Sequence, residues 1–184
     1  VFDKRYNKEN FKIHDYFFAK ALDKVKVGGV VAFITTKGTM DKMSSDVREY
    51  LAKRANLLGA IRLPTNSFAN TEVTTDIIFL QKREQMREEL PSWVKTEEYD
   101  AGVNINKYFI DHPEMVMGEF HKVSTQFGKF DFDVASSSQE LAYLYKAIET
   151  STMIEDIKKM LPKLDVCKGP VNLKLKVYGS ILDI

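Results

Sequence analysis

The sequence lacks the features that would place it in a membrane or in an oxidising compartment. Its 184 residues include one cysteine, Cys167, so the chain cannot form an internal disulfide or a cysteine-based zinc cluster. No apolar run approaches the roughly 18 residues that a membrane-spanning helix requires, and no signal peptide is visible. We therefore expect a cytoplasmic protein that does not contact a membrane.

An excess of charge of one sign is also absent. The 27 Lys and Arg residues nearly balance the 26 Asp and Glu residues, which leaves a net charge of +1. Proteins that bind nucleic acid commonly carry a basic excess, so any DNA contact in this chain has to come from a local groove. The apolar fraction of 44% is ordinary for a globular protein, and the length allows one sizeable core, alone or with an appendage.

Histidine is scarce, and the three that are present do not indicate a metal site. His14, His112 and His121 lie far apart, with no cysteine or carboxylate at the spacing of metal ligands. Glycines 28–29 do not form a phosphate-binding loop, because a strand rather than a helix is predicted to follow them. We expect no metal ligands in this chain.

The first half of the chain alternates between helical and strand patterns. Apolar residues from Ile13 to Val25, among them Phe17 and Leu22, recur at helical spacing until glycines 28–29 end the helix. The predicted elements are a helix over 13–25, a strand over 30–34, a helix beginning at Ser44 or Ser45, and strands over 57–63 and 76–81. Only about a dozen residues separate the last two strands, too few for a helical crossover, so these strands are predicted to be antiparallel neighbours.

The second half is less regular. Residues 83–98 are charged and compatible with a helix, and residues 100–134 contain short β-compatible runs broken by glycine and proline. Asp131 and Asp133 would share one face of a strand, and no general acid pairs with them. The sequence predicts three parts: a linker over 1–12, a first domain over 13–99, and an α+β extension over 100–184 with a helical region at 136–160.

The order of these elements and the side chains at the strand ends resemble the C-terminal half of an adenine-specific DNA methyltransferase domain. The signature consists of Arg62-Leu63-Pro64 at the end of one strand, Phe68 in the following loop, and the strand from Thr75 to Lys82. Residues 13–82 are similar to the modification subunits of type I restriction systems. The fold class implied is α/β: a partial class I, Rossmann-like methyltransferase sheet that lacks its cofactor-binding first half and is followed by an α+β extension.

A second segment carries a further resemblance. Residues 104–118 resemble a stretch that follows the methylase domain in very large mobile-element proteins, which join a methylase to an SNF2-type helicase and travel on phages and conjugative elements. The two resemblances together cover roughly residues 13–118. None is assigned to residues 135–184.

The resemblance implies an activity for the intact parent protein. S-adenosylmethionine would be the methyl donor and the exocyclic amine of adenine the acceptor, as in restriction–modification. In that family a Gly-rich loop binds the cofactor and an Asn-Pro-Pro-aromatic segment orients the adenine amine; both would lie upstream of Val1. We therefore expect a fragment with no catalytic or cofactor-binding residues of its own, which binds no cofactor and is inactive alone.

The resemblance also implies partners. The intact parent would bind DNA, and the missing N-terminal half of the methyltransferase domain would complete the sheet beside the strand at 30–34. An open hydrophobic edge recruits other strands. We therefore predict that the chain self-associates through this edge or covers it with residues 1–12 or 165–184.

Phe68 is the main candidate for a site residue. An enzyme that methylates a base in duplex DNA must flip that base out of the stack, and aromatic side chains hold flipped bases. By the resemblance, Phe68 stacks on the adenine; the alternative is that its ring fills the core beneath the loop. Lys37, just after a predicted strand, and Thr74 and Thr75 are candidate DNA contacts. Their ordinary alternatives are a solvated lysine and threonines that favour β geometry.

Two other functions stay open on the sequence. The chain could be a non-catalytic DNA-positioning or protein-interaction module of a mobile-element helicase–methylase protein. It could also be a complete small Rossmann-like protein of unknown role. The upstream gene sequence separates these functions, because a Gly-rich strand–turn–helix followed by Asn-Pro-Pro-Phe/Tyr would identify a methyltransferase.

Overall fold

A computed structural model describes the larger part of the chain. The described residues are 4, 6, 11–65, 67–68, 72–100, 102–125 and 130–136. The helical region predicted at 136–160, apart from Ser136, and the final segment over 165–184 lie outside these residues, as does most of the predicted linker over 1–12.

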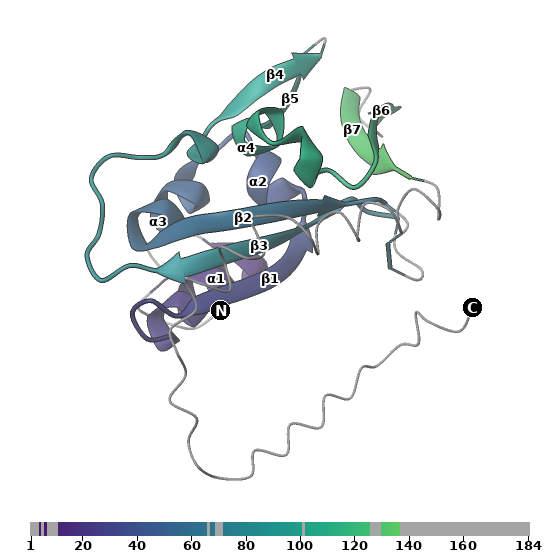
Figure 1. Cartoon of the computed structure of the whole chain (residues 1–184). Coiled ribbons are helices and arrows are strands. Elements are labelled where there is room, and N and C mark those ends of the chain that lie inside the picture. The colour runs from purple at the N-terminus through teal and green to yellow at the C-terminus, as the bar shows by residue number, and fades with distance from the viewer. Residues whose placement is uncertain are drawn as a thin grey trace.

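The described elements are helices and strands that are mixed along the chain (Figure 1). In chain order they are α1 (Ile13–Lys24), β1 (Val30–Thr36), α2 (Gly38–Asp41), α3 (Asp46–Arg54), β2 (Ala55–Leu63), β3 (Thr75–Lys82), η2 (Ser92–Val94), β4 (Thr96–Asp100), β5 (Val103–Asn106), α4 (Lys107–Asp111), η3 (Pro113–Met115), β6 (Glu119–Ser124) and β7 (Phe130–Ala135). The fold is mixed α/β, as the sequence predicts.

The central sheet has three strands in the order β1-β3-β2. β3 is antiparallel to both of its neighbours, so β1 and β2 run parallel to each other on either side of it. The antiparallel pairing of the second and third predicted strands is thereby confirmed. Because of this order, the carboxyl ends of β1 and β2 lie at the same edge of the sheet as the first residue of β3, and the candidate site residues are gathered at that edge.

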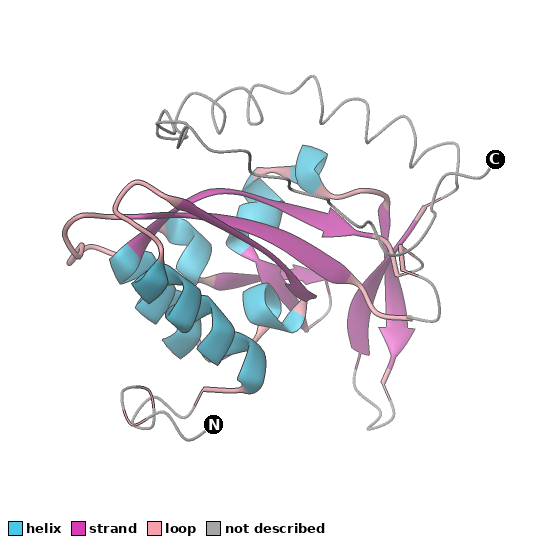
Figure 2. Cartoon of the chain, turned by 90° about the horizontal axis from the view of Figure 1, so that it is seen from below, coloured by secondary structure: helices cyan, strands magenta, loops and turns pink. Residues whose placement is uncertain are grey.

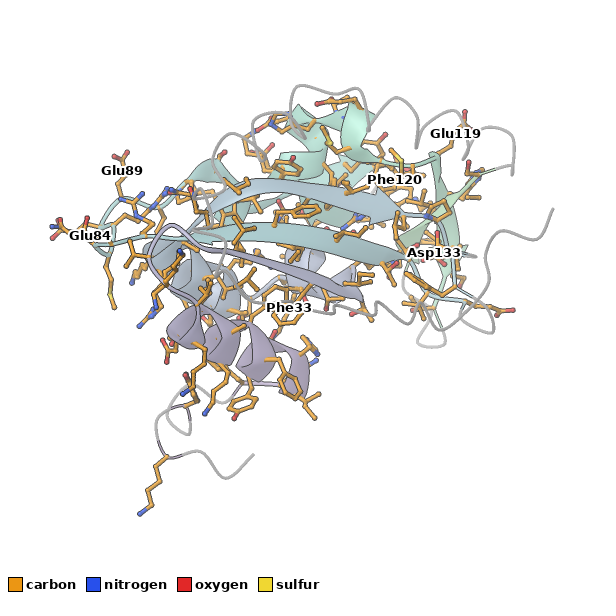
Figure 3. All side chains as sticks on the ribbon, turned by 60° about the horizontal axis from the view of Figure 1, so that its bottom comes forward. Phe33, Glu84, Glu89, Glu119, Phe120 and Asp133 are labelled. Atoms are coloured by element: carbon orange, nitrogen blue, oxygen red, sulfur yellow. The ribbon has the colours of Figure 1, made fainter. Side chains whose placement is uncertain are left out.

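One face of the sheet carries the main apolar core. Phe33, Ile78 and Ala60 face each other across β1, β3 and β2, and Ile78 and Ala60 are buried. The Phe33 ring meets Phe18 of α1 edge-on, with 5.0 Å between the ring centroids. Figure 3 shows Phe33 on the side of the sheet that faces this helix. α1 and α3 therefore cover the same face, and together with the sheet they exclude water from it.

The first helix forms where the sequence predicts it, but the expected apolar stripe is partly wrong. The side chains that α1 buries are Phe18, Ala19, Leu22 and the carboxylate Asp15, whereas Ile13 is 65% and Phe17 53% exposed. The sequence of α1 is apolar on more than one side, so periodicity does not select the buried face. Packing against Phe33 and α3 selects which face of α1 is buried.

The helix-compatible segment over 83–98 is not an α-helix. It contains only the short 3-10 turn η2, and β4 begins at Thr96. The Arg83 side chain donates to Asn56 Oδ1, 2.8 Å away, and the Arg87 amide donates to the Lys53 carbonyl at 3.0 Å. These tertiary contacts, with the burial of Trp93 and Val94, override a helical tendency that came mainly from charged residues.

The extension is joined closely to the sheet domain. The β4–β5 hairpin runs from Thr96 to Asn106, across the predicted boundary at residue 99. The Asn106 side chain accepts from the Tyr108 amide at 2.9 Å and so caps α4, and it donates to the carbonyls of Met40 at 2.8 Å and Trp93 at 2.9 Å. One buried side chain therefore ties α2, η2 and α4 together. Pro113 stands at the first position of η3, where a residue without an amide hydrogen loses no helical hydrogen bond.

The β1 strand is at the edge of the sheet in the part of the chain that the structure describes, where its one partner strand is β3. Ile34 on this strand is 55% exposed. The segments predicted to cover this edge are almost entirely outside the described residues, so that cover stays a prediction.

Candidate functional site at the strand ends

The site residues expected from sequence lie at the edge where β1 and β2 end and β3 begins. Lys37 follows β1 directly, and its amide donates to the Thr74 carbonyl at 3.1 Å. Thr74 immediately precedes β3, and Thr75 is its first residue. The segment from Pro64 to Thr74, which contains Phe68, connects β2 to β3. Residues far apart in sequence therefore meet at this edge, where ligands bind in open α/β sheets.

The Lys37 side chain turns toward β7. Its ammonium group lies 2.9 Å from an oxygen of Asp131 and 2.9 Å from Asp133 Oδ1, and it donates to the Phe132 carbonyl. Only 15% of the side chain is exposed. Asp131 and Asp133 share one face of β7, as the sequence predicts, but their lysine partner was not foreseen. The ammonium group of Lys37 is therefore paired with these two carboxylates. Contact between Lys37 and DNA stays a prediction.

The two neighbouring threonines have opposite surroundings. Thr74 is fully buried; its hydroxyl lies 3.1 Å from the Thr65 hydroxyl and accepts from the Val134 amide at 3.1 Å. Thr75 is 7% exposed, and its hydroxyl has no hydrogen-bond partner among the described residues. The Thr74 hydroxyl thus has internal partners, whereas the Thr75 hydroxyl has none in the part of the chain that the structure describes. Neither hydroxyl lies at the surface, and contact with DNA stays a prediction for both.

Phe68 lies in the connection between β2 and β3. Its side chain is half-buried and packs against the main apolar core. Just before it, the Ser67 amide donates to the Pro64 carbonyl at 3.1 Å, which forms a tight turn. This position is compatible with both roles inferred from sequence, a ring that stacks on a base and a ring that closes the core under the loop.

A buried ion cluster, formed by Arg62, Asp76 and Asp41, lies next to this edge of the sheet. Arg62 of β2 is 1% exposed and binds Asp76 of β3 in a bidentate manner, with distances of 2.8 and 2.9 Å. Its third nitrogen lies 2.8 Å from Asp41 of α2, and the guanidinium plane covers the Phe109 ring at 4.1 Å. The sequence signature contained Arg62 and Asp76, but only the structure shows that they form a pair that locks β2 to β3.

The electrostatics of this cluster follow from its burial. Burial lowers the pKa of Arg62, but the charges of Asp76 and Asp41 outweigh this effect, so the net shift is upward and Arg62 stays charged. Burial raises the pKa of Asp76, and the bidentate contact with Arg62 opposes that shift. A buried pair of this kind contributes little net stability, yet removal of one partner leaves an uncompensated charge.

A polar cavity of about 320 Å³ opens beside these groups. It lies between the start of α1, the end of β1 and β5, and its charged lining includes Lys12, Lys37, Asp15, Asp41 and Asp131. The lining thus carries both positive and negative groups. Such a lining suits a neutral polar ligand better than a strongly charged one.

The glycine-rich cofactor loop that the resemblance implies for the intact protein can be compared with the described glycines. A cofactor loop of that family needs glycines in open backbone geometry after a strand and before a helix. The described glycines with positive φ are Gly28, Gly102 and Gly118, and none of them stands between a strand and a helix. The same part of the chain holds no group of three or more His, Cys, Asp or Glu side chains placed to bind a metal. It also holds no helix with the length and apolar character needed to cross a membrane.

The chain belongs to the N-6 DNA methylase family, whose model matches residues 2–160. Over 93 residues, or 48% of the chain, it is also 34% identical to "Defense against restriction protein B" of Escherichia phage P1. The chain spans 4% of the length of that relative. The resemblance to adenine-specific DNA methylases is therefore confirmed at the level of the family, whereas the type I-like subtype stays a prediction.

Proposed function

We propose that this chain forms the target-base side of an adenine-specific DNA methyltransferase. The family match over residues 2–160 carries this proposal. The sheet supports it, because two parallel strands with an antiparallel strand between them fit the far edge of a class I, Rossmann-like methyltransferase sheet. In the proposed parent protein, the central strands of the methyltransferase domain pair with the open edge of β1.

The proposed work of this chain is to receive the flipped adenine. Phe68 lies in the loop at the strand ends and offers a ring on which the base can stack. S-adenosylmethionine, bound by other residues of the intact enzyme, supplies the methyl group. Among the described residues, Phe68 holds the base, while the cluster of Arg62, Asp76 and Asp41 fixes the strands that carry the loop.

The distribution of charge indicates where DNA would lie. Residues 1–95 contain 17 basic and 12 acidic residues, whereas residues 96–135 contain 3 basic and 8 acidic residues. Contacts to phosphates supply most of the affinity of a protein for DNA, so the acidic extension is a poor surface for the backbone. We propose that DNA approaches the sheet domain and that the outer face of the extension points away from it.

Substitution of Phe68 in the intact protein tests the proposal. Loss of base stacking in Phe68→Ala removes about 1–3 kcal/mol and lowers DNA-dependent turnover roughly tenfold to hundredfold. Phe68→Tyr and Phe68→Trp retain much of the activity, because either ring offers a π-face. Affinity for the cofactor without DNA stays the same.

A matched control separates stacking from core filling. Phe79 is another half-buried phenylalanine of the sheet, within β3 and away from the strand ends, so Phe79→Ala lowers stability without a selective loss of turnover. If Phe68 only fills the core, Phe68→Ala instead costs about 3–5 kcal/mol of folding stability and Phe68→Trp is overpacked. If Phe68→Ala lowers the melting temperature and reduces all functions in proportion, the stacking role of Phe68 is contradicted.

The chain without the rest of the protein is proposed to be inactive. No described glycine of positive φ stands between a strand and a helix, which supports a cofactor loop located elsewhere in the intact protein, so we expect calorimetry to detect no stoichiometric binding of S-adenosylmethionine by the chain alone. Micromolar binding at one molecule per chain would contradict this expectation.

A second function is favoured by the phage relative. That protein is named for defence against restriction, and the chain covers only 4% of it. The chain could therefore serve as a non-catalytic DNA-positioning or protein-interaction module of a large mobile-element protein, including one with an SNF2-type helicase. The intact protein then transfers no methyl group to adenine in unmodified DNA, while an active parent does. Its place in restriction–modification and in the cytoplasm stays a prediction in both cases.

A further inference from the structure

The loop that carries Phe68 is closed at its base by two threonines. Thr65 stands at the start of the loop and Thr74 at its end, and their hydroxyls lie 3.1 Å apart. This contact joins the two sides of the loop just beyond the sheet. The position of the loop therefore depends on whatever fixes these two residues.

A single residue of β7 binds both sides of this base. The Val134 carbonyl accepts from the Thr65 amide at 2.9 Å and from the Thr65 hydroxyl at 3.1 Å. The Val134 amide donates to the Thr74 hydroxyl at 3.1 Å, and the Thr74 hydroxyl also lies 3.4 Å from Asp133. Thr74 and Val134 are fully buried, so water does not compete for the bond from the Val134 amide to the Thr74 hydroxyl.

β7 is itself anchored independently of the loop. It pairs along its length with β6, and the side chain of Phe132 is buried in a small core with Val103 and Ile105. Lys37 binds Asp131 and Asp133 from the end of β1. Figure 2 shows the β6–β7 hairpin standing across the end of the three-stranded sheet, and Figure 3 shows Asp133 at that end, opposite Glu84 and Glu89. Because these contacts hold the hairpin in place, its hydrogen bonds to Thr65 and Thr74 can fix the position of the loop.

We propose that β7 is a positioning element for the loop from Thr65 to Thr74 and thereby sets where Phe68 meets the target base. Thr74 is the central positioning residue, and Lys37 acts through Asp131 and Asp133 instead of touching DNA. The part of this inference that concerns the base rests on the proposed function, whereas the bracing of the loop does not. The extension is then a working part of the base-binding side although it lies about 60 residues further along the chain, as the Thr74 to Val134 bond shows.

Two adjacent substitutions test the brace. Thr74→Val keeps the shape of the side chain but removes the acceptor for the Val134 amide, whereas Thr75→Val removes a buried hydroxyl that has no partner among the described residues. In this chain, we expect hydrogen exchange at the Thr65 and Val134 amides to become about tenfold faster in Thr74→Val. In Thr75→Val the exchange at these two amides stays within about twofold of the original chain.

A spectroscopic probe reports on Phe68 itself. Fluorophenylalanine placed at position 68 gives a ¹⁹F signal whose shift and width depend on the surroundings of the ring. We expect Thr74→Val to shift or broaden this signal. Ile78→Val, a core substitution in the middle of β3 that costs about 0.5–1.5 kcal/mol, lowers the melting temperature without changing the signal. If Thr74 contributes only to overall stability, Thr74→Val and Ile78→Val both lower the melting temperature and both leave the ¹⁹F signal unchanged.

A second variant acts on β7 from the other side. Gly118 precedes β6 with φ at +151°, and a Cβ there would lie 2.2 Å from the Ala135 carbonyl oxygen. Gly118→Ala therefore displaces the end of β7 without altering the loop, and we expect it to change the ¹⁹F signal of position 68 as Thr74→Val does. An unchanged signal and unchanged exchange in both variants would overturn the proposal.

The outcomes for the brace and for the proposed function are separable. If the signal and the exchange respond as expected but Phe68→Ala leaves turnover of the intact protein unchanged, the brace stands and the stacking role fails. If Phe68→Ala lowers turnover while Thr74→Val and Gly118→Ala leave the loop unchanged, the stacking role stands and the brace fails.

Discussion

Residues 1–95 and residues 96–135 differ both in charge and in what holds them together. The first region has 17 basic and 12 acidic residues and is built on a continuous apolar core that includes Leu22, Leu51 and Leu80. The second has 3 basic and 8 acidic residues, and its own core is a small cluster of three buried residues, Val103, Ile105 and Phe132. Two hairpins with so little apolar surface of their own do not form an independent unit.

The contacts between the two regions explain how the second is placed. Phe109 and Val134 of the second region reach into the main core, but the orientation is set by polar side chains. Asn106 binds the backbone of α2 and η2, Thr74 binds Val134, and Lys37 binds Asp131 and Asp133. Apolar packing tolerates small shifts, whereas buried hydrogen bonds have defined partners and directions. The acidic region is therefore attached to the strand ends in one defined geometry.

The largest expected effect comes from the ion cluster of Arg62, Asp76 and Asp41, which lies in the first region and contacts the second through the Phe109 ring. Arg62→Ala leaves Asp76 buried without its bidentate partner and removes the contact with Phe109, so we expect a loss of about 3–5 kcal/mol of folding stability. The shift of the urea unfolding midpoint measures this loss. The double variant Arg62→Met/Asp76→Leu, which removes the bidentate pair and leaves only the more exposed Asp41, recovers a large part of it. A loss below about 1 kcal/mol in Arg62→Ala would show that the cluster is not structurally important.

A smaller effect is expected at Asn106. Asn106→Ala removes three hydrogen bonds and leaves two backbone carbonyls and the Tyr108 amide without that partner, so we expect a loss of about 2–4 kcal/mol. Asn104, on the same strand, is half-exposed and lines the polar cavity, and Asn104→Ala changes stability by less than about 0.5 kcal/mol. Equal midpoints for the two variants would contradict the role of Asn106 as the link between the regions.

The smallest effect is expected at Lys37, where the carboxylate partners are partly exposed. Asp131 and Asp133 have 43% and 32% of their side chains exposed, so solvent screens the attraction and Lys37→Met costs about 1 kcal/mol. Raising the salt concentration from about 0.05 to 1 M should weaken the same contact in the original chain. Hydrogen exchange of residues 130–135 measures both effects. Exchange that is faster in salt for the original chain but unaffected by salt in Lys37→Met supports the pairing, and a salt response of equal size in both contradicts it.

The sheet could be predicted from the sequence because its signals are local. The apolar run before Thr35 and the short connection between residues 63 and 75 were sufficient to predict the strands and the antiparallel pairing of the last two. The resemblance in sequence identified the right family. The face that α1 buries and the bends over 83–95 could not be predicted, because both depend on packing against distant residues.

The site could be predicted only in part for the same reason. Phe68 was identified by the resemblance, and Lys37, Thr74 and Thr75 from their places next to predicted strands; the structure does gather them at one edge. Their partners were hidden, since Lys37 and Asp133 are 96 residues apart and Thr74 and Val134 are 60 apart. The spacing of Asp131 and Asp133 predicted that both lie on one face of a strand. Nothing in that spacing indicates which basic side chain pairs with them.

A fluorescent base in the DNA measures directly whether Phe68 holds an adenine that has left the stack. 2-Aminopurine, placed at the adenine that the intact protein methylates, is dim when stacked in a duplex and bright when it leaves the stack. We expect the intact protein to raise the fluorescence strongly. Phe68→Ala should reduce the flipped fraction, because the loss of about 1–3 kcal/mol shifts the equilibrium roughly tenfold or more. Equal fluorescence with phenylalanine and alanine at position 68, in proteins of equal melting temperature, would contradict the account.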